Sequence, residues 1–240
     1  MEIDPVAARL GGSTVRHPRL NGYSYGGHDV DVLITGVGMV AAAAWCSRML
    51  TQAFSGTSVV ASDPSTSSGS PRAESRGDFS RTVSQYDLAL NIGLCGSFDG
   101  SLEPGTVVHV VSDRIAELGA EDGDAFLTIT QMDLAAEYEF VNSAPPDNAA
   151  LRDLPAVSGI TVNTVHGRES SIAAVTGRFK PQVESMEGAA FMYACLIHDV
   201  AFAQVRAVSN VVESRNRGAW KMREAISRLG NIALSILDHA

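Results

Sequence analysis

The sequence predicts an α/β protein whose mixed sheet is flanked by helices on both faces. Three observations support this fold class: strand-like and helix-like segments alternate along the chain, hydrophobic residues make up 45% of it, and several apolar segments end in glycine or polar residues. Strands that alternate with helices need cover on both faces of their sheet. With 240 residues, the chain is expected to form a single domain, residues 1–240, with one large core.

The expected strands are short runs of apolar and β-branched residues, and the expected helices are longer runs rich in alanine and other apolar residues. In chain order, the segments are strand 30–35, helix 39–51, strands 88–92, 106–112 and 159–165, helix 187–197, strand 201–208 and helix 220–239. Glycine-containing turns, 36–38 and 93–97, follow the first two strands. Two stretches interrupt the alternation: 62–80, dense in Ser, Gly, Pro and charge, is expected to be a mobile surface loop, and 142–153 a second loop.

Charge and cysteine content exclude several classes of function. The net charge of −9 and the pI of about 5.1 argue against a nucleic-acid partner, which needs a basic face. The sequence contains no apolar run of membrane-spanning length and no basic-then-apolar secretion signal, so we expect no membrane partner and a cytoplasmic location. Cys46, Cys95 and Cys195 lack metal-ligand spacing and are expected to be reduced.

Two polar residues, Glu187 and Asn210, follow strand-like segments where helices are expected to begin. In an open α/β sheet, ligands bind outside the carboxyl ends of the strands. A carboxylate can accept hydrogen bonds from two sugar hydroxyls, and an amide carries both a donor and an acceptor for the edge of a purine. The pair therefore indicates a nucleoside site.

Each of these residues also has a purely structural interpretation. Glu187 would interact favourably with a helix dipole, and Asn210 would serve as a helix cap. The turn at 36–38 either cradles a phosphate or is only a tight turn, since Ala41 replaces the third glycine of the dinucleotide fingerprint. His166 would be a packing residue. The motifs of serine, cysteine and zinc hydrolases are absent from the sequence.

Taken together, these segments resemble the nucleoside phosphorylase/nucleosidase family. The resemblance covers most of the chain and rests on the segments 36–38, 91–97, 185–190 (Ser-Met-Glu-Gly-Ala-Ala) and 208–210 (Val-Ser-Asn). Within the family the chain is most similar to the futalosine hydrolases, on the segments 96–98 (Gly-Ser-Phe), 118–124, 183–190 and 215–217 with Trp220. Members of that group cleave futalosine to hypoxanthine and dehypoxanthine futalosine in menaquinone biosynthesis.

The resemblance implies roles for individual residues. Met186 and Glu187 match the family's ribose contacts, with Glu187 on the 2′- and 3′-hydroxyls. Further substrate contacts are implied at Cys95, Gly96, Val165, His166, Arg215 and Trp220. Asn210 stands where methylthioadenosine nucleosidases carry an aspartate that protonates adenine, and an asparagine there resembles the phosphorylases that act on 6-oxopurines. That match fits hypoxanthine as the leaving base.

The N-terminus departs from the family pattern, because the first family strand is apparently absent before Met1-Glu2-Ile3. Glu2 then aligns with the carboxylate that activates the attacking water, which makes Glu2 and Asn210 the expected catalytic residues. No metal and no organic cofactor is implied, and the expected partners are a purine nucleoside and further copies of the chain, in a homodimer or larger homo-oligomer.

Three alternatives to a futalosine hydrolase stay open. A methylthioadenosine/S-adenosylhomocysteine-type nucleosidase would share the ribose site. A purine nucleoside phosphorylase would need an arginine near the glycine turn; residues 39–46 contain none, which leaves Arg48 or an arginine of a partner chain to serve. A non-catalytic nucleoside-binding protein would follow if the absent strand had removed the activity.

Overall fold

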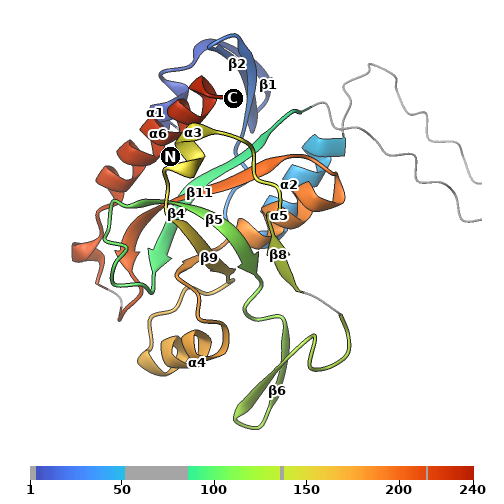
Figure 1. The fold of residues 1–240 in the computed structure, drawn as a ribbon, viewed down its shortest axis with the longest axis vertical. Helices are drawn as coiled ribbons and strands as arrows, with labels where there is room; N and C mark the ends of the chain where they lie inside the picture. Colours follow the sequence, from blue (N-terminus) through green and yellow to red (C-terminus); the bar gives the residue numbers. More distant parts are fainter. Residues whose placement is uncertain (1–3, 52–85, 136–137, 215) are drawn as a thin grey trace, which may run out of the picture.

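The computed structural model describes residues 4–51, 86–135, 138–214 and 216–240, and places a six-stranded mixed sheet at the centre of the molecule (Figure 1). The order is β11-β4-β10-β9-β5-β8, and β11 also pairs with β5, so five of the strands close into a ring. The strands are β4 (Ala89–Ser97), β5 (Val107–Arg114), β8 (Glu139–Val141), β9 (Ala156–Thr161), β10 (Val183–Ser185) and β11 (Phe202–Val211). Neighbours run parallel in the pairs β11–β4, β10–β9 and β5–β9, and antiparallel in the others.

Helices cover this sheet on both faces, as the sequence predicts. They are α1 (Asp4–Ala7), α2 (Met39–Thr51), α3 (Ala149–Arg152), α4 (Glu169–Phe179), α5 (Gly188–Ile197), α6 (Met222–Asp238) and the short 3-10 helix η1 (Arg217–Ala219). Alternate side chains of β11 point to opposite faces. Ala203, Val205 and Ala207 pack with α6, whereas Phe202 packs with α5 and α2, and Figure 1 shows these helices on either side of the sheet.

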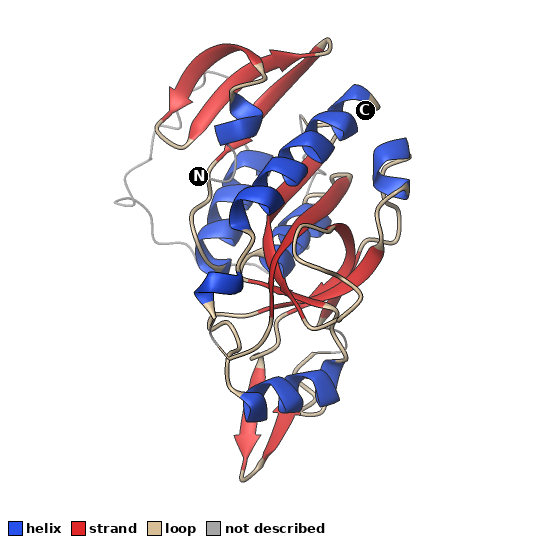
Figure 2. Cartoon of the chain, turned by 90° about the vertical axis from the view of Figure 1, so that its left-hand side faces the viewer, coloured by secondary structure: helices blue, strands red, loops and turns tan. Residues whose placement is uncertain are grey.

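The segment before α2 forms a separate antiparallel sheet of β1 (Gly11–His17), β2 (Leu20–Tyr25) and β3 (His28–Leu33). Figure 2 shows it at one end of the molecule, with α4 and the hairpin of β6 (Gly119–Asp122) and β7 (Ala125–Thr128) at the other. A strand is present where we expected one at 30–35, but β3 ends at Leu33, belongs to this small sheet and has Val32 as its buried residue, so the expected burial is wrong. The side chains of Asp29 and Asp31 alternate with the valines and need solvent or a polar partner.

Several predicted boundaries are corrected by the structure. The segment 93–97 is not a turn, because β4 continues through both of its glycines to Ser97. The strand expected at 159–165 ends at Thr161, and the loop expected at 142–153 contains α3, which Asn148 caps. The last helix begins at Met222 rather than at 220. The loop expected at 62–80 lies outside the described residues, and the single domain and the absent first strand stay predictions.

A buried polar group fixes the start of α5 against the sheet. Asp113 of β5 accepts hydrogen bonds from Thr161 Oγ1 and Gln204 Nε2, both at 2.9 Å, and Thr161 Oγ1 accepts one from the backbone N–H of Ala189 at 2.7 Å. Burial raises the pKa of the Asp113 carboxyl to about 6, an effect that these hydrogen bonds oppose. Only a glycine fits at position 188, because a Cβ there would lie 2.2 Å from the Asp113 carboxylate. The group therefore sets the position of the residue just before α5, Glu187.

Candidate active site

The candidate site lies over Gly96, near the carboxyl end of β4. Asn210 of β11 and Glu184 of β10 are both paired with Gly96, one on each side. A Cβ placed on Gly96 would lie 3.5 Å from both Asn210 Nδ2 and Glu184 Cγ, and 2.8 Å from Val212 Cγ2. The missing side chain of Gly96 therefore leaves room for Val212, and the side chains of Asn210 and Glu184 lie on either side of this position.

Asn210 is part of the sheet and not of a helix terminus. It lies in β11, and α6 begins only at Met222, so the helix-cap interpretation is wrong. Its Oδ1 lies 2.7 Å from the Ser209 hydroxyl, which is also within 3.1 Å of the Cys95 carbonyl oxygen, and its Nδ2 donates to the Val211 carbonyl oxygen at 2.8 Å. These contacts fix the orientation of the amide beside Gly96.

On the other side of Gly96, Glu184 and His166 form a close pair. Glu184 is 4% exposed and accepts a hydrogen bond from the backbone N–H of His166 at 3.1 Å. The Nδ1 atom of His166 lies 2.7 Å from the second carboxylate oxygen. Phe98 packs edge-on against the imidazole, with 6.1 Å between the ring centroids. The loop that carries His166 lies at the site, because a Cβ on Gly167 would lie 3.7 Å from the Glu213 carbonyl oxygen, just after β11.

The Glu187 carboxylate is held at both oxygens. One accepts a hydrogen bond from the backbone N–H of Gly38 at 3.0 Å, and the other lies 3.5 Å from Nη1 of the buried Arg206. Gly38 has a φ of +95°, which a glycine adopts without strain, and this conformation aims its N–H at Glu187. Glu187 precedes α5, but its side chain makes no capping hydrogen bond to that helix. Its carboxylate instead binds the backbone of the turn at 36–38.

The remaining predicted site residues differ in burial and in their position in the fold. Cys95 precedes Gly96 in β4, and burial raises the pKa of its thiol to about 12, which excludes it as a thiolate nucleophile at neutral pH. Met186 is half-buried beside Glu187, and Val165 is 46% exposed in the loop before His166. Glu2 and Arg215 lie outside the described residues, so their roles stay predictions.

Trp220 is connected to the site through its neighbour. The backbone N–H of Lys221 donates to the Ser209 carbonyl oxygen at 2.9 Å, which ties the start of α6 to the strand that carries Asn210. A surface cavity of about 750 Å³ lies along this segment and is lined by residues 220–224. Trp220 therefore lines this cavity and precedes α6 rather than lying in its first turn.

Two charged residues of the site, Glu184 and Arg206, were missed from the sequence. Both lie within apolar strands, where an ionised side chain is costly unless it is paired. A charged residue within an apolar strand was therefore the sequence feature that could have identified both residues. Arg206 is 2% exposed, and its Nε and Nη2 atoms have no hydrogen-bond partner among the residues that the structure describes.

The described residues hold neither a metal-ion cluster nor a membrane-spanning helix. They contain no group of three or more His, Cys, Asp or Glu side chains arranged to hold a metal ion. None of their helices is both long and apolar enough to cross a membrane.

Curated proteins with similar sequences are futalosine hydrolases. The protein from Streptomyces coelicolor is 33% identical over 147 residues, which cover 60% of this chain and 62% of that protein. The protein from Thermus thermophilus is 32% identical over 157 residues, 63% of this chain and 69% of that protein. The matched region is thus somewhat under two thirds of the length of the Streptomyces relative.

Solved structures share the fold over nearly the whole chain. A methylthioadenosine/S-adenosylhomocysteine nucleosidase from Colwellia psychrerythraea, in complex with adenine, superposes with a TM-score of 0.69 at 21% identity, covering 98% of this chain and 90% of that one. The futalosine hydrolase of Helicobacter pylori superposes with a TM-score of 0.70 at 11% identity, covering 99% and 93%.

The sequence also matches the phosphorylase superfamily over residues 12–238. This match includes every described residue of the candidate site, from Gly38 to Trp220. The family predicted from the sequence is confirmed: the chain belongs to the phosphorylase superfamily.

Proposed function

We propose that this protein hydrolyses the N-glycosidic bond of futalosine and releases hypoxanthine and dehypoxanthine futalosine, in menaquinone biosynthesis. The observation that carries the proposal is a set of fixed polar side chains: Asn210 and Glu184 flank Gly96, and Gly38 and Arg206 hold Glu187. An amide can bind the base and a fixed carboxylate can bind the sugar, which are two of the groups that suit nucleoside cleavage. The sequence similarity to futalosine hydrolases supports this choice of substrate.

The geometry suits a reaction in which the sugar becomes positive and the base becomes negative. Glu187 would accept hydrogen bonds from the ribose hydroxyls and stabilise positive charge on the ring, because the bonds from Gly38 and Arg206 fix it without neutralising it fully. Asn210 would donate to the base as its charge grows. Since these interactions strengthen along the reaction, they favour the transition state over the bound substrate.

The test is release of base from futalosine, inosine and methylthioadenosine, each with and without inorganic phosphate. We expect hypoxanthine from futalosine at the same rate in both buffers, and slower release from the other two nucleosides. Preferred cleavage of methylthioadenosine would identify a methylthioadenosine-type nucleosidase instead. Binding of futalosine without release of base would identify a non-catalytic binding protein.

A purine nucleoside phosphorylase is the second candidate, and Arg206 favours it. The two unpartnered nitrogens of this buried guanidinium are donors of the kind that a phosphate accepts, and Glu187 connects Arg206 to the glycine turn. The same two donors would suit an attacking water. Release of base only in the presence of phosphate, together with a ribose 1-phosphate product, would favour the phosphorylase.

We also propose that the protein works as a homodimer or larger homo-oligomer in the cytoplasm. Three large apolar side chains of α5, Tyr193, Leu196 and Ile197, are 44–55% exposed in the single chain. Contact with a second copy would remove them from water. Light scattering at micromolar concentration is the measurement, and a monomer would contradict the proposal.

A further inference from the structure

We propose that His166, held by Glu184, is the acid that protonates the purine as it leaves. This inference rests on the proposed nucleosidase function and names a group that the function requires. Asn210 cannot supply the proton, because an amide is not an acid at any physiological pH. The proton must therefore come from solvent or from another group at the base.

The His166–Glu184 pair lies at the required place. Glu184 Cγ and Asn210 Nδ2 each lie 3.5 Å from the position of a Cβ on Gly96, so the two side chains lie on either side of Gly96. His166 is attached to that carboxylate by two contacts, 3.1 Å from its backbone N–H and 2.7 Å from Nδ1. The imidazole is therefore held by the side chain that lies across Gly96 from Asn210.

The pair also fixes which nitrogen of the ring is available. An ionised carboxylate only accepts hydrogen bonds, so Nδ1 carries the hydrogen that faces Glu184. Within the described part of the chain, Nε2 makes no hydrogen bond. A carboxylate on one nitrogen orients a histidine and stabilises its imidazolium form, which leaves an N–H donor on the other nitrogen.

The step conserves atoms and charge. As the bond from C1′ to N9 breaks, its electron pair passes to the purine, and the Nε2 proton of His166 moves to a purine ring nitrogen. Water adds its oxygen to C1′ and loses a proton to solvent, and the neutral imidazole regains a proton from solvent. His166 is then a catalytic residue, and Glu184 is a positioning residue that acts through it.

The test uses a substrate that does not need the acid. Methylation of futalosine at N7 gives the base a positive charge, so that base leaves without protonation. General acid catalysis contributes about 10²- to 10⁴-fold. H166Q should therefore lose at least about 100-fold in kcat/KM on futalosine but less than about threefold on N7-methylfutalosine. E184Q should shift the ratio of the two substrates in the same direction, by less.

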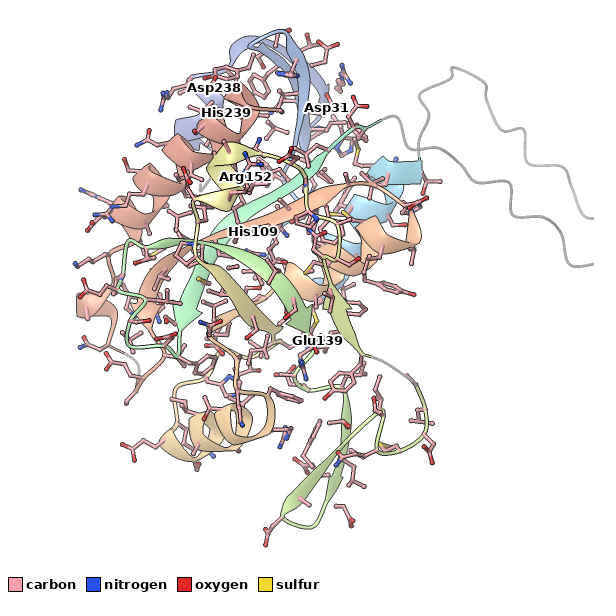
Figure 3. The ribbon with its side chains drawn as sticks, in the orientation of Figure 1. Asp31, His109, Glu139, Arg152, Asp238 and His239 are labelled. Atoms are coloured by element: carbon pink, nitrogen blue, oxygen red, sulfur yellow. The ribbon has the colours of Figure 1, made fainter. Side chains whose placement is uncertain are left out.

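The control is H239Q, which changes a histidine at the far end of α6, beside the small sheet (Figure 3). It should leave both rates at the wild-type level. If the wild type is active and H166Q loses the same factor on both substrates, His166 contacts the base without donating a proton, and the inference is wrong. If the wild type releases base from neither nucleoside, the nucleosidase function fails, and the role of His166 with it.

Discussion

The substitution G96A tests whether the space between Asn210 and Glu184 is where the base binds. The φ angle of Gly96 lies outside the left-handed region, so alanine meets no backbone strain there. Its methyl group would lie 2.8 Å from Val212 Cγ2, closer than the 3.5–4.0 Å at which carbon atoms normally rest. Val212 must then move by roughly 0.7 Å or more, and overpacking of this kind costs about 1–3 kcal/mol.

That cost should appear as a lower melting temperature, by about 2–4 °C for each kcal/mol in a chain of this size. The effect on catalysis should be larger, because a displacement of the base by about 1 Å costs on the order of 100-fold. We therefore expect G96A to remain folded, with kcat/KM for futalosine reduced about 100-fold. The assay is hypoxanthine release combined with thermal unfolding.

A second substitution separates the strain from the blocked site. V212A removes the side chain that the new methyl group contacts, so G96A should cost little stability in the V212A background, while its effect on activity should persist. G100A is the matched control, since a Cβ on Gly100 meets nothing within 4 Å. Activity of G96A at the wild-type level, or its full recovery in G96A/V212A, would refute the assignment of the base to this space.

Three further predictions address the charges of the site. E187Q should lower kcat/KM by about 100-fold or more, because the amide cannot stabilise a positive sugar. The control E169Q, at an exposed glutamate of α4, should leave kcat/KM unchanged. Wild-type rates in E187Q would show that Glu187 does not bind the ribose. N210D should lower the preference for futalosine over aminofutalosine, its adenine counterpart, by about 5- to 150-fold in kcat/KM, since an ionised aspartate only accepts hydrogen bonds, and an unchanged ratio would mean that Asn210 does not read the base. Because burial raises the pKa of Asp113 to about 6, the folded state binds that proton more tightly than the unfolded state, so the wild type should gain up to about 3 kcal/mol over D113N as the pH falls from 7 to 4; urea unfolding that gives a constant difference would contradict this.

Apolar composition predicted the long elements well. The helix expected at 39–51 matches α2 in both bounds, and the segments expected at 187–197 and 201–208 correspond to α5 and β11. In α5 and β11 most residues are apolar and buried, whereas in α2 the buried residues are Ala42, Met49 and Leu50. The polar residues at their ends, Glu187 and Asn210, were found for the same reason.

Glycine was the main source of error. The glycines of 93–97 suggested a turn, but in β4 they allow neighbouring strands and side chains to approach closely, as at Gly96. Conversely, Gly26 and Gly27, both at positive φ, form the turn of a hairpin that was not predicted. Glycine therefore occurs both in a tightly packed strand and in a hairpin turn, and only the tertiary contacts distinguish the two cases.

The pairing of buried charges could not be read from the sequence. Glu184 and His166 are 18 residues apart, and Arg206 reaches Glu187 from another strand. Each charge conflicts with its apolar segment, which signals that a partner exists, but the strand order of the sheet decides which partner it is.

The most direct test of the proposed function is the rate of hypoxanthine release from futalosine in phosphate-free buffer, compared between wild type and E187Q and repeated with phosphate added. We predict rapid release by the wild type that phosphate does not change, and at least about a 100-fold slower rate in E187Q. Release by the wild type only after phosphate is added, or an equal rate in E187Q, would contradict hydrolysis at this site.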